Sequence, residues 1–180
     1  LTDPSSALIG DFAIGTATGD YFYCTGKTGE VTMSGLDPTH SYKFKLFASR
    51  YHNSENRTST YTFTGENQVI GSLQTSGFDI GSDGYDGNND TVYVSESIAP
   101  SEEGIITLAV SYSQGSYGYI GIVEIEDYNV DLYPSSEVLE NELFFDFGKN
   151  DEANGNSTLG ADVNGNYWNN ITNTSSLGSP

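Results

Sequence analysis

The chain has little cysteine and little positive charge. Cys24 is the single cysteine among 180 residues, so the chain can form neither an internal disulfide nor a CxxC redox motif, and we expect a buried structural thiol. Lysine and arginine together number 6 against 25 aspartates and glutamates, a formal net charge of −19. A polyphosphate needs a basic surface to release its counterions, so we expect no nucleic-acid partner.

Long apolar runs are also missing. No stretch approaches the roughly 20 consecutive apolar residues that a membrane-spanning helix needs, so we expect no membrane insertion. The N-terminal residues lack an initiator methionine, a basic region and an apolar signal core, which predicts an excerpt of a longer or processed polypeptide. Scarce lysine with abundant Asp, Asn, Gly, Ser and Thr and 13 tyrosines is typical of a bacterial exported module, so we expect a secreted or cell-surface location.

Catalytic motifs are scarce as well. His40 and His52 are the two histidines, the first in a predicted turn after Pro38 and the second in a polar loop, without a Ser or Cys nucleophile motif. The chain has no Gly-x-Ser-x-Gly elbow and no phosphate-binding glycine loop. No strand end pairs two acids beside an evident cleft, as a glycosidase requires. We therefore expect a protein that is not an enzyme.

Strand-like alternation dominates what is present. Tyr42, Phe44 and Leu46 alternate with more polar residues, the period of a sheet with one buried face. Similar short runs, separated by Gly, Pro, Asn and Asp turn residues, predict further strands at residues 21–24, 30–34, 59–64, 68–75, 91–96, 104–112, 117–126 and 142–147. No amphipathic helix of three turns is evident to cover a single sheet. The pattern predicts an all-β fold, an antiparallel β-sandwich.

A change of composition near Asp127 divides the chain. We expect residues 1–127 to form the sandwich body, residues 128–141 a linker, and residues 142–180 a terminal strand and an Asn/Gly-rich loop. The terminal segment is too short for a core of its own, so it has to pack on another surface. It can complete this chain's sandwich or that of the next copy, because an unpaired sheet edge accepts an extended segment.

Several segments follow one another in an order that resembles a known family. They start with Ala-Thr-Gly-Asp-Tyr-Phe at residues 17–22 and Ser-Gly-Leu-Asp-Pro at residues 34–38, and continue through residues 42–50 and 56–65 to about residue 126. This order resembles a galactose-binding-like β-sandwich module, a kind that recurs in secreted multi-modular proteins of Bacteroidetes beside polysaccharide-degrading enzymes and adhesin repeats. The resemblance implies a jelly-roll sandwich that binds carbohydrate or serves as an adhesin repeat. One departure is that the segment from residue 145, which normally opens such a module, closes this chain.

Two of the six basic residues, Arg50 and Arg57, flank a polar segment that includes Tyr51 and Asn56. Guanidinium groups hydrogen-bond sugar hydroxyls and uronate carboxylates, and tyrosine rings stack on the apolar faces of pyranoses. We therefore expect a glycan site here; the alternative is that an arginine pairs with a nearby acid and pins a loop. Trp168 is a second candidate sugar platform, the alternative being that it anchors the docked tail.

A Gly-rich loop gathers oxygen ligands that suit calcium, at Asp79, Asp83, Asp86, Asn88 and Asp90. Ca²⁺ takes about 6 to 8 oxygen ligands, and glycines let backbone carbonyls point inward. The loop matches the first half of a DxNxD calcium loop but lacks the rest of an EF-hand. We expect a simple Ca²⁺ site; the alternative is a set of Asx turns whose side chains satisfy their own backbone.

Together these features predict a non-catalytic extracellular module, stabilised by calcium, that binds a polysaccharide or a cell-surface glycan. The alternative hypothesis is a structural repeat of a surface adhesin or filament, in which the C-terminal strand links consecutive copies of the chain.

Overall fold

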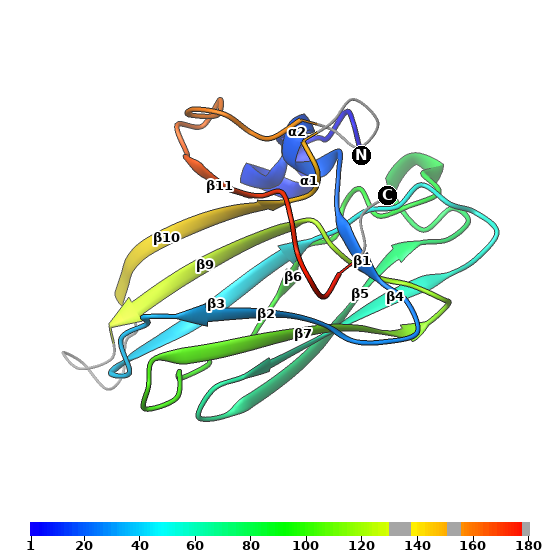
Figure 1. The fold of residues 1–180 in the computed structure, drawn as a ribbon. Helices are drawn as coiled ribbons and strands as arrows, with labels where there is room; N and C mark the ends of the chain where they lie inside the picture. The colour runs from blue at the N-terminus through cyan, green and yellow to red at the C-terminus, as the bar shows by residue number, and fades with distance from the viewer. Residues whose placement is uncertain (130–137, 151–155, 178–180) are drawn as a thin grey trace.

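The computed structural model describes residues 1–129, 138–150 and 156–177. Its strands form two facing sheets of five and four strands, and a short two-stranded pair lies at one end (Figure 1). The predicted all-β, antiparallel sandwich is thereby confirmed. No helix among these residues is both long and apolar enough to cross a membrane.

The five-stranded sheet has the order β11-β10-β9-β3-β6. Its neighbours pair antiparallel except β10 and β11, which are parallel. In that order the strands are Trp168–Ile171, Val138–Phe147, Ile122–Asn129, His40–Phe47 and Tyr93–Val94. The long central pairing of β3 with β9 gives this sheet a continuous ladder from His40 to Phe47.

The four-stranded sheet has the order β2-β7-β4-β5 and is antiparallel throughout. Its strands are Gly29–Ser34, Ile105–Gln114, Arg57–Thr64 and Gln68–Ser76. The short pair consists of β1 (Phe22–Cys24) and β8 (Gly118–Ile120). Gly121 separates β8 from β9, so the single strand expected over residues 117–126 is two strands in the structure.

The core lies between the two sheets and follows the predicted alternation. Inward residues of β3, among them Phe44 and Leu46, are fully buried, as are Tyr61 and Phe63 of β4. The rings of Phe44 and Phe63 stack with their centroids 4.5 Å apart, joining one sheet to the other. Burial of such side chains is the main force that holds the layers together.

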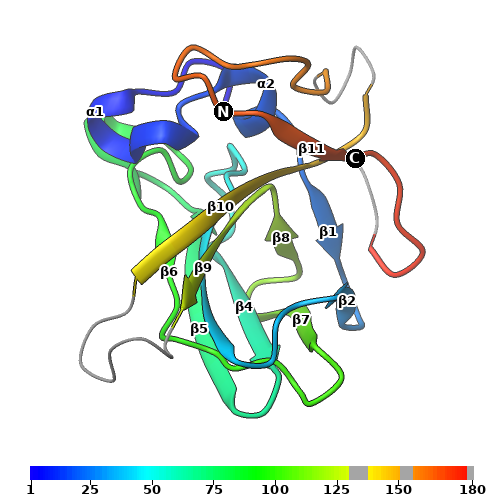
Figure 2. The ribbon, with the colours of Figure 1, turned by 90° about the vertical axis from the view of Figure 1, so that its left-hand side faces the viewer.

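Short helical turns at the N-terminus cover the outer face of the five-stranded sheet. They are α1 (Ser6–Ile9), η1 (Gly10–Phe12) and α2 (Gly15–Thr18), and they lie over β10 and β11 (Figures 1 and 2). Phe12 meets Phe144 of β10 edge to face, with ring centroids 6.5 Å apart. This apolar cluster, which also contains Trp168, gives the outer face a second, smaller core.

The terminal segment packs on its own chain in this structure. β10 pairs with β9, and β11 pairs with β10. Beyond β11 the chain crosses to the other sheet, where the Ser176 hydroxyl donates to the Glu30 carbonyl and accepts from the Glu30 amide. Within the expected linker, Tyr128 and Asn129 close β9 and residues 138–141 open β10; its remaining residues lie outside the described ones.

An apolar cavity of about 370 Å³ opens between β2 and β10, at the edge of the sandwich. Met33 and Leu36 line it on one side and Leu143 and Phe145 on the other. Leu143 remains 47% exposed, because no strand of the described chain closes the sheets at this edge.

Candidate functional site

Four tyrosines gather on one face of the short β1–β8 pair. The register sets Tyr23 opposite Tyr119, and side chains alternate along a strand, so Tyr21, Tyr23, Tyr117 and Tyr119 share one face. Phe22 and Ile120 point the other way, into the core. Tyr21 meets Tyr119 edge to face at 5.0 Å between centroids, and Tyr23 meets Tyr117 in the same way at 5.5 Å. We call these four residues the tyrosine face.

Two of the four rings of the tyrosine face are buried, and the other two are partly exposed. Tyr21 and Tyr119 are buried, whereas Tyr23 and Tyr117 are half-buried. Burial raises the pKa of Tyr119 to about 12 against the opposing effect of Arg57, and it raises the pKa of Tyr21 as well. Both phenols therefore stay protonated at neutral pH.

Arg57, the first residue of β4, is fixed against this face. Its guanidinium carbon lies 4.5 Å from the centroid of the Tyr117 ring, and its Nη1 donates to the Tyr119 hydroxyl. Its Nε donates to Glu55 at 2.6 Å. Burial acts to lower the pKa of Arg57, but the contacts with Glu55 and Tyr119 outweigh it and raise that pKa. The predicted alternative, an arginine paired with a nearby acid, describes part of the role of Arg57.

Arg50 contributes a second guanidinium, beside Tyr21. It follows β3, its side chain is exposed, and its guanidinium carbon lies 5.9 Å from the centroid of the Tyr21 ring. Within the described parts of the chain, no carboxylate forms an ion pair with it. Arg50 is therefore an accessible positive charge in a chain that has few of them.

The other predicted sugar-binding residues, Tyr51, Asn56 and Trp168, are not part of the tyrosine face. Tyr51 is 62% exposed and its ring lies 5.5 Å from that of Tyr85, while Asn56 is exposed in the loop before β4. Trp168 belongs to the apolar cluster under the N-terminal turns and is only 8% exposed. Its indole nitrogen donates to Asp162 at 2.9 Å. The alternative role for Trp168, an anchor of the tail, matches this environment.

Sequence reasoning missed the tyrosine face because its two halves lie far apart in the chain. The signal was present as two alternations, Tyr21-x-Tyr23 and Tyr117-x-Tyr119. Only the pairing of β1 with β8 shows that the two alternations share a face and border Arg57.

The loop expected to bind calcium uses most of its side chains internally. Asp86 accepts from the backbone amide of Asp79 at 2.9 Å, and Asp90 accepts from the Ser82 hydroxyl at 2.7 Å. Asn88 is buried, donates to the Ala48 carbonyl and accepts from the Thr91 amide. Asp79 and Asp83 adopt left-handed backbone conformations, with φ of 53° and 58°. These contacts match the predicted alternative of Asx-type turns.

A cluster of carboxylates that could hold a metal ion lies outside this loop. In the described part of the chain, three carboxylates converge within 4.8 Å of one another at Glu124, Glu126 and Glu142, and no three of the loop aspartates do so. Lys45 already occupies this position, with its ammonium 2.8 Å from Glu124 and 2.7 Å from Glu126. Burial disfavours the charge of Lys45, but both carboxylates outweigh it and raise the pKa of that amine. The ammonium group of Lys45 is therefore the counter-ion of this carboxylate cluster.

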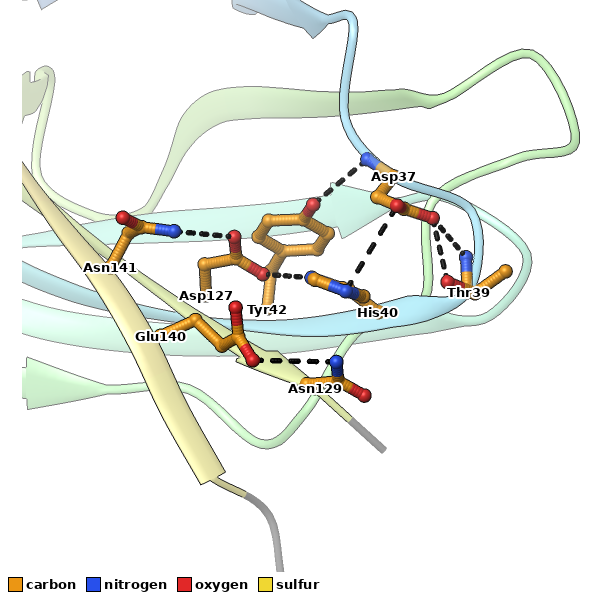
Figure 3. Close-up of polar contacts among 8 residues, drawn as sticks. All are labelled: Asp37, Thr39, His40, Tyr42, Asp127, Asn129, Glu140 and Asn141. Carbon is orange, nitrogen blue, oxygen red and sulfur yellow. Dashed lines mark hydrogen bonds and ion pairs between the residues drawn. The ribbon is translucent and has the colours of Figure 1, made fainter. Parts of the chain in front are cut away.

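A further polar network joins the ends of β3, β9 and β10 (Figure 3). The His40 ring bonds through Nδ1 to Asp127 at 2.7 Å, and its Nε2 lies 4.0 Å from Asp37. Asn141 donates to the same aspartate, Asp127. The bond to Asp127 is the main cause that raises the pKa of His40.

This network predicts that stability depends on pH through His40. Because the pKa of His40 is raised in the folded chain, its contribution is complete below the ordinary histidine pKa, near 6.5, and is lost as pH rises through the folded pKa. We expect His40→Gln to lower the free energy of unfolding, measured in urea, by about 0.5–1 kcal/mol more at pH 5.5 than at pH 8.5. His52→Gln is the control, since the His52 ring bonds to the Ser54 hydroxyl and not to a carboxylate. If His40→Gln lowered the free energy of unfolding equally at the two pH values, the proposed stabilisation by protonated His40 would be wrong.

The fold and the tyrosine face together define an all-β sandwich with an aromatic and cationic surface at one end. Comparison with known protein families, curated proteins and solved structures finds no match to this chain.

Proposed function

We propose that this protein is a non-catalytic, secreted or cell-surface module that binds carbohydrate through the tyrosine face and the two arginines beside it. One observation carries the proposal: four tyrosines, two of them partly exposed, and two guanidinium groups, brought from four separate parts of the chain, gather on one side of the short β1–β8 pair. Packing of the sandwich core does not require this arrangement, because aromatic rings can be buried equally well between the two sheets.

The chemistry of this surface suits a sugar. Pyranose rings have apolar faces that stack on aromatic side chains, and the half-buried Tyr23 and Tyr117 offer such rings near solvent. Sugar hydroxyls need hydrogen-bond donors and acceptors, which the tyrosine hydroxyls and Arg50 supply. An accessible guanidinium adds affinity for a uronate or another anionic sugar.

Binding to soluble polysaccharides tests the proposal. In native gels that contain a neutral or a uronate-rich polysaccharide, the wild-type chain should be retarded by at least one of them. Tyr117→Ala and Arg50→Ala should each weaken that binding about tenfold, since each removes a stacking or charged contact of about 1–2 kcal/mol.

Tyr167→Ala is the matched control, because Tyr167 is 74% exposed and lies outside the tyrosine face. This variant should bind like the wild type. The proposal fails if no polysaccharide retards the wild-type chain, or if Tyr117→Ala and Arg50→Ala bind as tightly as the control.

The second candidate function is a structural repeat of an adhesin or filament, with the tail strand exchanged between copies. One observation favours it: β11 is the edge strand of its sheet and pairs only with residues 144–147 of β10, so the rest of β10 lies at the edge, beside the apolar cavity that opens between β2 and β10. Strands at a sheet edge are the ones that proteins exchange or add. Strand exchange stays a prediction, because the structure contains one chain.

A further inference from the structure

Two buried aspartates meet where the N-terminal part of the chain packs against the tail. Asp20 precedes β1 and is 4% exposed, and Asp146 lies on β10 and is 2% exposed. In each, the oxygen Oδ1 accepts no hydrogen bond from an amide, a hydroxyl or a basic group, and the two carboxyl groups lie close enough to hydrogen-bond each other when one of them is protonated. Buried polar atoms in folded proteins nearly always have partners, so two orphaned oxygens at one place require an explanation.

The structure holds both carboxyl groups firmly in position. The other oxygen of Asp146 accepts from the amide and the hydroxyl of Thr158, at 3.2 and 3.0 Å. The carboxyl of Asp20 fits closely over Gly148, where a β-carbon would lie 2.0 Å from the carboxyl carbon. Glycine at this position therefore leaves the space that the Asp20 carboxyl occupies beside Asp146.

Two carboxylates at this depth need positive charge. Burial, followed by the charge of Asp146, raises the pKa of Asp20 to about 9, and burial also raises the pKa of Asp146. Within the described chain no lysine or arginine forms an ion pair with either aspartate, and the exposed guanidinium of Arg50 faces the ring of Tyr21.

A single shared proton would neutralise one of the two negative charges and leave the other buried. A divalent cation neutralises both and supplies a partner for both orphaned oxygens. We propose that Asp20 and Asp146 bind a divalent cation, with calcium as the best fit to hard carboxylate ligands, and that this ion joins the segment before β1 to the tail strand β10. The two carboxylates offer up to four of the about 6 to 8 oxygens that calcium takes, so carbonyl oxygens or water have to complete its shell.

This site differs from the loop of residues 79–90, where Asp86, Asn88 and Asp90 accept hydrogen bonds from other residues of the loop. It also differs from the cluster at Glu124 and Glu126, which already holds Lys45. In the described chain, the pair Asp20 and Asp146 combines carboxylates more than nine-tenths buried with oxygens that lack partners.

Thermal melting of the full chain, first stripped with chelator, tests the proposal. Saturating CaCl₂ at neutral pH should raise the Tm of the wild type by roughly 5–10 °C, because an ion that binds only the folded state stabilises that state. Asp20→Asn and Asp146→Asn keep the shape of the side chain and remove its charge, so each should abolish the shift. Asp86→Asn, in the loop of residues 79–90, is the matched control and should keep it.

Equilibrium dialysis of the wild type against radioactive calcium supplies a second readout if a variant fails to fold. One bound ion per chain is expected, and no bound ion overturns the proposal. A Tm that ignores both chelator and CaCl₂ also overturns it, and so does a calcium shift that persists in both charge-removing variants. A Tm that falls from pH 5 to pH 9 equally with and without calcium would show that a shared proton holds the pair instead.

Discussion

A chain that ends at Asn129 is expected to lose the cooperative unfolding transition of the whole chain. The truncation removes β10 and β11, and with them the ladder that β10 forms along β9. It also removes Phe144, Phe147 and Trp168, which are buried in the two apolar clusters. Burial of each such side chain contributes roughly 1.5–3 kcal/mol, so the loss is comparable with the whole stability of an ordinary domain.

Circular dichroism melting and size-exclusion chromatography check this expectation. A chain that ends at Leu177 keeps every described residue and is the control, which should melt like the whole protein. A truncated chain that melts cooperatively within a few degrees of the control would show that the tail is not part of the sandwich.

The same truncated chain distinguishes the two candidate functions. A peptide of residues 138–177, added in trans, should restore a cooperative transition if β10 and β11 can be supplied by another molecule. Restoration would support strand exchange between copies of the chain. A truncated chain that stays unfolded at every peptide concentration would count against the structural-repeat hypothesis and leave carbohydrate binding as the function to test.

Replacing Gly118 with alanine is expected to destabilise the fold by about 3 kcal/mol, the upper part of the range for overpacking. A β-carbon at Gly118 would lie 2.1 Å from the carbonyl oxygen of Ser111 and 3.1 Å from the sulfur of Cys24. The first of these contacts is with backbone, which cannot move aside as a side chain can. For a chain of this length the expected drop in Tm is roughly 6–12 °C.

Gly26→Ala is the control for this substitution. Gly26 has a positive φ of 65° but no atom within 4 Å of the position of its β-carbon, so alanine there meets only backbone strain of about 1–2 kcal/mol. Because β8 carries Tyr119 and borders Tyr117, Gly118→Ala should also weaken polysaccharide binding. Equal Tm values for the two variants would contradict the close packing of β8 on β7.

Most strands could be predicted from the sequence because their alternation is local. Tyr42, Phe44 and Leu46 bury one face of β3 as expected. The first residues of β10, 138–141, were expected to belong to a linker, since Leu139, Glu140 and Asn141 are all exposed there and show no apolar period. β11 was expected to be a loop, because its Asn-rich sequence becomes a strand only through pairing with β10.

Some residues of the candidate site could also be predicted from the sequence, and others could not. The rarity of basic residues pointed to Arg50 and Arg57, and both border the tyrosine face. The tyrosines themselves, and the meeting of Asp20 with Asp146, depend on which distant segments lie side by side. The acidic residues of the loop of residues 79–90 resemble a calcium site in the sequence, but in the structure the side chains of Asp86 and Asp90 bond to other residues of the loop.

By itself the amino-acid sequence determined the class of the fold, the large negative net charge and the absence of a disulfide within the chain, because these follow from composition and from the period-two alternation of neighbouring residues. The tertiary structure alone decided that four tyrosines share a face beside two arginines, and that two aspartates are buried together. Strand pairing joins residues far apart in the chain, and no local pattern specifies which strand becomes the neighbour of which.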